Sequence, residues 1–172
     1  MTRYAVFLRG VNVGGVNLKM ADVAAALTDA GFTQVRTILA TGNVLLESPA
    51  EADVVRKNAE TVLRKSFGYD AWVLVYDVDA VRAIVDAYPF AREVDGYQSY
   101  VTLVTDAHVL DELAALAAGP DEKIARGKGV IYWQVAKGST LDSAIGKTMG
   151  KKRYKSSTTT RNLRTLNKVV AG

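Results

Sequence analysis

Hydrophobic and polar positions divide the first 76 residues into short apolar runs and longer periodic segments. A continuous apolar run at 4–8 and similar β-branched runs farther along predict strands, whereas apolar residues three or four positions apart predict helices. Gly31 and Gly68 end the two helical segments, where left-handed caps are common. The predicted strands are 4–8, 34–39, 43–47 and 71–76, and the predicted helices are 20–30 and 52–67. This β-α-β-β-α-β order is typical of a ferredoxin-like subdomain, with two helices on one face of a four-stranded antiparallel sheet.

The pattern from residue 77 onward is less regular and predicts a second, smaller α+β unit. Its predicted strands are 97–105, 123–126 and 130–135, and its predicted helices are 79–88, 107–118, 139–149 and 159–170. Asp106 is a suitable N-cap for the helix at 107, and Thr158 or Thr159 for the last helix. The middle of this half repeats a β-α-β-β order without a residue-level repeat. We therefore predict an α+β protein with two subdomains, 1–76 and 77–172, the second ending in a basic helix.

Charge is distributed unevenly along the 172 residues. The formal net charge is +4, but segment 143–172 holds eight basic residues and no acid, so residues 1–142 carry 14 basic against 18 acidic residues. Such asymmetry indicates an anionic partner, either nucleic acid or a phosphorylated small molecule. Packing of the basic segment on the acidic body of the same chain explains the asymmetry equally well.

The residue types exclude several kinds of chemistry. The chain has no cysteine, which excludes disulfides, thiolate metal ligands and a cysteine nucleophile. His108 is the only histidine, so we predict no metal site and no cofactor, and no Ser-His-Asp set is identifiable. The absence of a signal-peptide pattern and of a long apolar run favours a cytoplasmic protein with no membrane partner. Catalysis by positioning and electrostatics stays open, as does the oligomeric state.

A loop rich in glycine and asparagine follows the first strand. Arg9 ends that strand, and the loop supplies the candidate ligand-binding residues Asn12, Gly14, Gly15 and Asn17. The glycine spacing matches neither the dinucleotide nor the P-loop fingerprint. Consecutive backbone N–H groups in such a loop bind an anion when they point into one concavity. The alternative, which spacing alone favours, is a tight corner that uses glycine for positive φ.

The predicted sheet brings a second polar turn to the same edge. In a β-α-β-β-α-β unit the first and third strands are adjacent and antiparallel. The end of the first strand, Arg9, is therefore expected beside the start of the third, Gly42-Asn43. This convergence makes Asn43 a further candidate, although glycine and asparagine are also ordinary turn formers.

The C-terminal segment carries the strongest chemical pattern. On the predicted helix 159–170, Leu163, Leu166 and Val170 fall on one face, and Arg161, Arg164 and Lys168 fall on the other. A solvated helix face is the simpler interpretation, but the helix lacks acids that would pair with these charges. The ligand-binding candidates here are Arg161, Asn162, Arg164 and Thr165. Basic residues around one tyrosine suit single-stranded nucleic acid, and the candidates are Lys147, Lys151, Lys152, Arg153, Tyr154, Lys155 and Lys168.

Four motifs together resemble a known family. They are RGVNVGGVN, GFTQVRTILATGNVLLES, YPF and TTTRNLRTLNKV. In combination they resemble domain of unknown function 1697, an uncharacterised bacterial family, and the similarity runs from Ala5 to about Val170. The resemblance implies two α+β subdomains, one of them ferredoxin-like, and brings no established activity.

The residues in these motifs are mostly polar or have special backbone roles. We therefore predict that the opening loop, the Gly42-Asn43 turn and the segment Arg161–Thr165 line one cleft between the subdomains. The predicted ligand is anionic, either phosphorylated or nucleotide-like. Three alternatives remain: nucleic-acid binding through the basic segment, an enzyme acting on an anionic substrate, and hydrogen bonds that only join the two halves.

Overall fold

The chain forms two compact units. The computed structural model describes residues 1–11, 16–138, 144–149, 151, 154 and 156–172. Unit 1 comprises Met1–Arg82 and Asn167–Gly172, and unit 2 comprises Ala83–Leu166. From the sequence we predict a boundary after residue 76, with the whole C-terminal helix in the second subdomain. In the structure, by contrast, the last six residues belong to unit 1.

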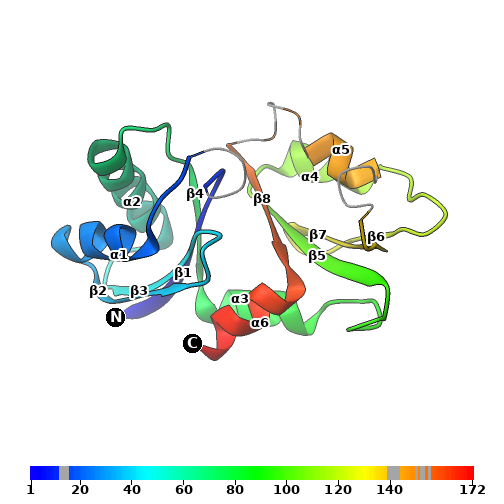
Figure 1. Cartoon of the computed structure of the whole chain (residues 1–172), viewed down its shortest axis with the longest axis horizontal. Coiled ribbons are helices and arrows are strands. Elements are labelled where there is room, and N and C mark those ends of the chain that lie inside the picture. Colours follow the sequence, from blue (N-terminus) through cyan, green and yellow to red (C-terminus); the bar gives the residue numbers. More distant parts are fainter. Residues whose placement is uncertain (12–15, 139–143, 150, 152–153, 155) are drawn as a thin grey trace. The chain divides into compact units, whose positions relative to one another are not determined.

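Unit 1 contains a four-stranded antiparallel sheet with two helices on one face (Figure 1). Its strands are β1 (Thr2–Leu8), β2 (Thr33–Ile38), β3 (Asn43–Ser48) and β4 (Val73–Asp77), and its helices are α1 (Met20–Asp29) and α2 (Ala52–Phe67). The order β2-β3-β1-β4 is the order that the β-α-β-β-α-β pattern predicts. Helix α2 has the predicted bounds, because Gly68 ends it with φ +66° and donates its N–H to the Arg64 carbonyl.

Both faces of the first sheet are apolar. Val6 and Leu8 of β1 pack with Leu27 of α1 and Leu63 of α2 on the helix-covered face. Side chains alternate along a strand, so Phe7 points to the opposite face, where it is buried as well. The C-terminal residues cover part of this second face. Gly172 packs closely on this face, since a Cβ added to it would lie 3.0 Å from Leu45 Cδ1 and 3.1 Å from Ile38 Cδ1. The Arg3 guanidinium also donates a hydrogen bond to the Gly172 carbonyl.

Unit 2 contains a second four-stranded antiparallel sheet, and the α+β class is confirmed. Its strands are β5 (Tyr97–Val104), β6 (Lys123–Arg126), β7 (Val130–Ala136) and β8 (Thr158–Asn162), and its helices include α4 (Ala107–Ala114) and α5 (Ala144–Met149). Asp106 caps α4 as predicted, because its carboxylate accepts from the N–H groups of His108 and Val109. The prediction that α4 extends to residue 118 is wrong, since the helix ends at Ala114.

The prediction of one helix over 159–170 is also wrong. Residues Thr158–Asn162 form strand β8, which pairs antiparallel with β5, and helix α6 (Leu163–Ala171) begins only afterwards. Consecutive β-branched threonines favour a strand because their side chains fit a pleated surface. The N-cap is not Thr158 or Thr159. It is Asn162, whose Oδ1 accepts from the Arg164 N–H at 2.9 Å.

Strand β8 gives the two units the same order of elements. Each consists of β-α-β-β-α-β with the strands arranged 2-3-1-4, and each last strand leads directly into a nine-residue helix, α3 (Val78–Asp86) or α6. Two backbone hydrogen bonds at the end of the first strand recur in both. In unit 1, the Leu8 N–H donates to the Gly42 carbonyl (2.8 Å) and the Arg9 N–H donates to the Trp72 carbonyl (3.0 Å). The corresponding bonds in unit 2 run from the Val104 N–H to the Gly129 carbonyl (3.0 Å) and from the Thr105 N–H to the Ser157 carbonyl (2.9 Å). The second half therefore repeats the first in topology.

Among the described residues, no helix has the length and apolar character that crossing a membrane requires.

Candidate anion site at the end of strand β1

The predicted convergence of the first and third strands is confirmed. Phe7 pairs with Asn43, and the Leu8 N–H donates to the Gly42 carbonyl at 2.8 Å. Gly42 has φ +91°, and a Cβ there would lie 2.8 Å from Val11 Cγ2 and 2.9 Å from Leu8 Cβ. Only glycine fits both the backbone conformation and this close approach. The turn is therefore packed tightly against the segment that follows β1.

Asn43 holds this turn together. It is fully buried, and its Nδ2 donates to the Ile38 carbonyl and to Thr41 Oγ1, both at 2.9 Å. These bonds close the hairpin between β2 and β3 and give the amide a structural role. Leu39 in the same turn adopts φ +59° and is 47% exposed. A left-handed conformation costs a leucine roughly 1–2 kcal/mol, and such strain concentrates at functional sites.

The glycine-rich loop is only partly described. Asn12, Gly14 and Gly15 lie outside the described residues. Asn17 is exposed, and the neighbouring Val16 forms a parallel bridge with Val11. The choice between a binding loop and a structural corner at 12–15 therefore stays a prediction.

Arg9 is the candidate residue whose surroundings point most clearly to a ligand. It follows β1 directly, and its side chain is half-buried. Its Nε atom is buried without a hydrogen-bond partner, and the guanidinium forms no ion pair with any described residue. Burial lowers the pKa of Arg9 from its usual value, since removal from water disfavours the charged form. The folded protein thus holds a partly desolvated cation without a described counter-charge.

Trp72 connects the backbone of Arg9 to a second arginine, Arg64. The Arg9 N–H donates to the Trp72 carbonyl at 3.0 Å, so the residue that follows β1 lies beside the residue that precedes β4. The Arg64 guanidinium lies 4.9 Å from the centroid of the Trp72 ring, and its Nε and Nη2 donate to the Ala71 carbonyl. Arg64 also forms no ion pair with a described residue. We call Arg9, Arg64 and Trp72 the Arg9 site.

Sequence reasoning missed Trp72 and Arg64. A usable signal was present, because the β-α-β-β-α-β order places the start of the fourth strand beside the end of the first. Trp72 precedes β4 and was predictable as a neighbour of Arg9. Arg64 was not, because its contact with Trp72 depends on how the end of α2 packs.

The C-terminal candidates all belong to unit 2. Arg161 does not lie on an exposed basic helix face as predicted. It is buried in strand β8, where its Nη1 donates to Thr159 Oγ1 and the Thr160 carbonyl. Asn162 caps α6 and donates to Gln98 Oε1, Arg164 is exposed and Thr165 is partly exposed. The predicted cleft joins residues of both units and stays a prediction.

The nucleic-acid candidates lose their aromatic member. Tyr154 is 4% exposed in the core of unit 2, and its hydroxyl donates to Glu112 Oε2 at 2.8 Å. A ring in that position does not stack on a base. Lys147, Lys151 and Lys168 are exposed, while Lys152, Arg153 and Lys155 lie outside the described residues.

Metal-ligand clusters and shifted carboxyl groups were sought among the described residues. The described part of the chain contains no cluster of three or more histidine, cysteine, aspartate or glutamate residues that would hold a metal ion. Within the part of the chain that the structure describes, the carboxyl group with a shifted pKa is Asp53, an exposed residue whose pKa is lowered by a hydrogen bond from Arg56. Asp53 and Arg56 form a surface ion pair of α2.

Comparison with known proteins identifies the class of fold and then the family. The chain is similar to the solved structure of the conserved bacterial protein SP0830 from Streptococcus pneumoniae, with 24% sequence identity and a TM-score of 0.81 over 99% of this chain and 97% of that one. This likeness supports the two-unit α+β fold. A family model described as "Protein of unknown function (DUF1697)" matches residues 1–132, so the chain belongs to this family, as its motifs indicate. No curated protein matches the chain significantly.

Proposed function

We propose that this protein binds a small anionic ligand, one that carries a phosphate or carboxylate group, at the Arg9 site of unit 1. The observation that carries the proposal is the buried, unpartnered Nε of a half-buried guanidinium that has no described counter-charge. A buried charge without a partner is costly and persists where a ligand needs it. Arginine presents its donors in a planar fork that matches phosphate and carboxylate oxygens.

The neighbouring residues agree with an anionic ligand. A second guanidinium, that of Arg64, lies over the ring of Trp72, whose carbonyl accepts from the Arg9 N–H, and no described acid pairs with either arginine. Leu39, which is exposed and has a positive φ, lies in the turn between β2 and β3. Strand β3 pairs with β1 on the side opposite β4. The lack of cysteine supports a cytoplasmic location for this activity. Nucleic-acid binding has less support, because Tyr154 is buried.

A thermal-shift panel tests the proposal. The probes are inorganic phosphate, pyrophosphate, adenosine monophosphate, citrate and a short oligonucleotide, in a buffer free of other polyvalent anions. A ligand at 100 times its Kd stabilises the folded state by about 2.7 kcal/mol, which raises the Tm of a chain of this size by roughly 5–10 °C. We expect such a shift from at least one small anion.

Two arginine variants locate the binding. Arg9→Gln removes the charge from the site, and Arg36→Gln removes the same charge from an exposed residue of strand β2. The shift should disappear in Arg9→Gln and persist in Arg36→Gln, while Arg9→Lys should retain part of it. A panel without any shift, or a shift that survives in Arg9→Gln, contradicts the proposal. A response to the oligonucleotide alone favours the basic segment instead.

A further inference from the structure

The backbone around Trp72 is clamped by two side chains of helix α2. Arg64 donates from Nε and Nη2 to the Ala71 carbonyl at 3.1 and 2.8 Å. Glu60, one turn earlier on the same helix, accepts the Val73 N–H on its Oε2 at 3.1 Å. The carbonyl belongs to the peptide group before Trp72 and the N–H to the peptide group after it. Helix α2 therefore fixes both peptide groups of this residue.

The clamp includes a buried carboxylate. Glu60 is only 6% exposed, and its Oε1 accepts from Arg56 Nη1 at 3.0 Å. Burial of a carboxylate is costly even when it is paired and hydrogen-bonded, and an apolar side chain fills such a space without that cost. Supporting hydrogen bonds of this kind hold a functional residue in a defined orientation. The clamp thus indicates that the orientation of Trp72 matters.

Trp72 itself is partly exposed, although its backbone is held in place. The Arg64 guanidinium lies 4.9 Å from the centroid of the ring, and a guanidinium over a ring covers only one of its two faces. The other tryptophan of the chain, Trp133, is 2% exposed, and its ring stacks on Tyr100. Tryptophan is highly buried on average, and partly exposed rings are enriched where proteins make contacts. Trp72 is therefore the tryptophan that a ligand can reach.

Trp72 and Arg9 share one face of the sheet. The register of β1 and β4 pairs Leu8 with Val73, and the hydrogen bond from the Arg9 N–H to the Trp72 carbonyl continues it by one residue. Side chains of residues paired in this way project from the same face of an antiparallel sheet. The aromatic ring and the partly desolvated guanidinium therefore belong to the same face of unit 1.

We infer that the anion at the Arg9 site carries a planar aromatic ring, which stacks on Trp72 while the anionic group binds Arg9. This inference rests on the proposed function and specifies the ligand class, an aromatic anion, which is either a nucleoside phosphate or an aromatic carboxylate. Stacking of a ring on an aromatic side chain raises affinity by about tenfold. Trp72 is then the residue that selects aromatic over non-aromatic anions.

Calorimetric titration of the full-length chain with two pairs of ligands tests this inference. Adenosine monophosphate and ribose 5-phosphate share the sugar phosphate, but only the first has an aromatic base. Phenylacetate and cyclohexylacetate share a carboxylate and a six-carbon ring, but only the first ring is planar. We expect the aromatic member of at least one pair to bind about tenfold more tightly than its partner, and that pair identifies the anionic group. Equal affinities within both pairs, or no binding of either aromatic member, overturn this inference, while the thermal-shift panel decides the proposed function separately.

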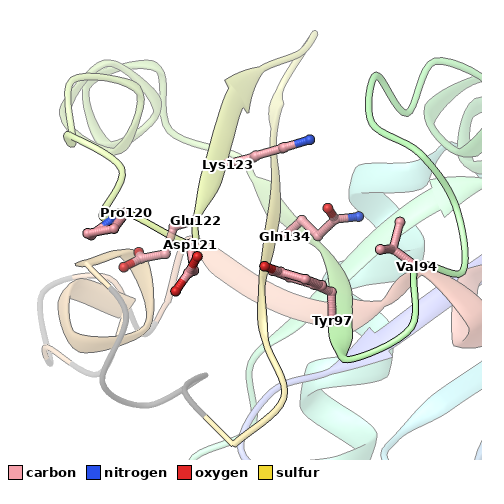
Figure 2. A pocket seen from close by; sticks show the side chains of 7 residues that line it. All are labelled: Val94, Tyr97, Pro120, Asp121, Glu122, Lys123 and Gln134. Carbon is pink, nitrogen blue, oxygen red and sulfur yellow. The ribbon is translucent and has the colours of Figure 1, made fainter.

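Trp72→Leu and Tyr97→Leu form a matched pair of variants. Each removes a partly exposed aromatic ring, but Tyr97 belongs to unit 2, where it lines a cavity of about 240 Å³ (Figure 2). Trp72→Leu should reduce the preference for the aromatic ligand from about tenfold to about twofold or less, and Trp72→Phe should keep most of it. Tyr97→Leu should leave the preference as it is in the wild type. The Tm of each variant reports whether it is folded, and a preference that survives in Trp72→Leu refutes the role of Trp72.

Discussion

Replacing Arg9 by methionine should stabilise the protein when no anion is present. The buried Nε has no hydrogen-bond partner, and an unsatisfied buried donor costs about 1–3 kcal/mol. Methionine keeps a flexible apolar chain in the same space and removes both the unpaired donor and the desolvated charge. No described ion pair is lost. We therefore expect the free energy of unfolding to rise by about 1 kcal/mol, or the Tm by about 2–4 °C.

Urea unfolding in an anion-poor buffer measures this change, with fluorescence and circular dichroism as parallel probes. Arg36→Met is the matched control, because Arg36 is exposed on β2 and its loss should alter stability by less than about 0.5 kcal/mol. Adding the anion identified by the panel should reverse the ranking, because only the wild type is then stabilised. A loss of about 1 kcal/mol or more in Arg9→Met would falsify the reasoning and show that the guanidinium supports the fold.

Three further predictions concern the turn glycines, the cap of α6 and Tyr76. Gly42→Ala should lower the free energy of unfolding, measured with urea, by about 2–4 kcal/mol, because Gly42 combines a positive φ with close contacts. Gly129 also has a positive φ, but a Cβ there would meet its nearest atom at 3.7 Å. Gly129→Ala should therefore cost only about 1 kcal/mol. Equal losses would contradict the packing argument. Asn162→Ala should lower the free energy of unfolding by about 1 kcal/mol, because it removes the cap of α6. Asn162→Asp keeps an oxygen that can cap the helix but loses the hydrogen bond to Gln98. If Asn162→Asp is no more stable than Asn162→Ala, the capping role is refuted. Burial raises the pKa of Tyr76 from 10.0 to about 12, and each pKa unit corresponds to about 1.4 kcal/mol. The stability linked to the protonated hydroxyl, about 2.7 kcal/mol, is therefore present below pH 10 and is lost as the pH rises toward 12. Tyr76→Phe should lose less stability than the wild type over that range.

The sequence was most informative where local signals agree. Helix α2 and its cap at Gly68 were predicted residue by residue, because amphipathic spacing and a terminal glycine point to the same ends. The segment from Thr158 to Asn162 was mispredicted because the helical spacing of Leu163, Leu166 and Val170 was extended backward over it. A long-range partner, strand β5, decides its conformation, and single-sequence periodicity does not contain that partner.

The candidate site was predictable only in part. The proximity of Arg9 to the Gly42 turn followed from strand order alone. The burial of Arg161 and Tyr154 did not, because a long side chain with a polar end is equally suited to a surface and to a hydrogen-bonded interior. The partnerless Nε of Arg9 is likewise a property of packing.

The matching topology of the two units has a consequence for the origin of the protein. Two copies of one ancestral segment, joined by duplication, would share their elements and the hydrogen bonds at the strand ends, as these units do. One difference between the units lies in the connection that follows their first strand. Residues 9–19 separate β1 from α1, whereas only residues 105–106 separate β5 from α4. If the units arose by duplication, the long connection that begins at Arg9 was gained by the first copy or lost by the second, and the proposed anion site belongs to one copy alone.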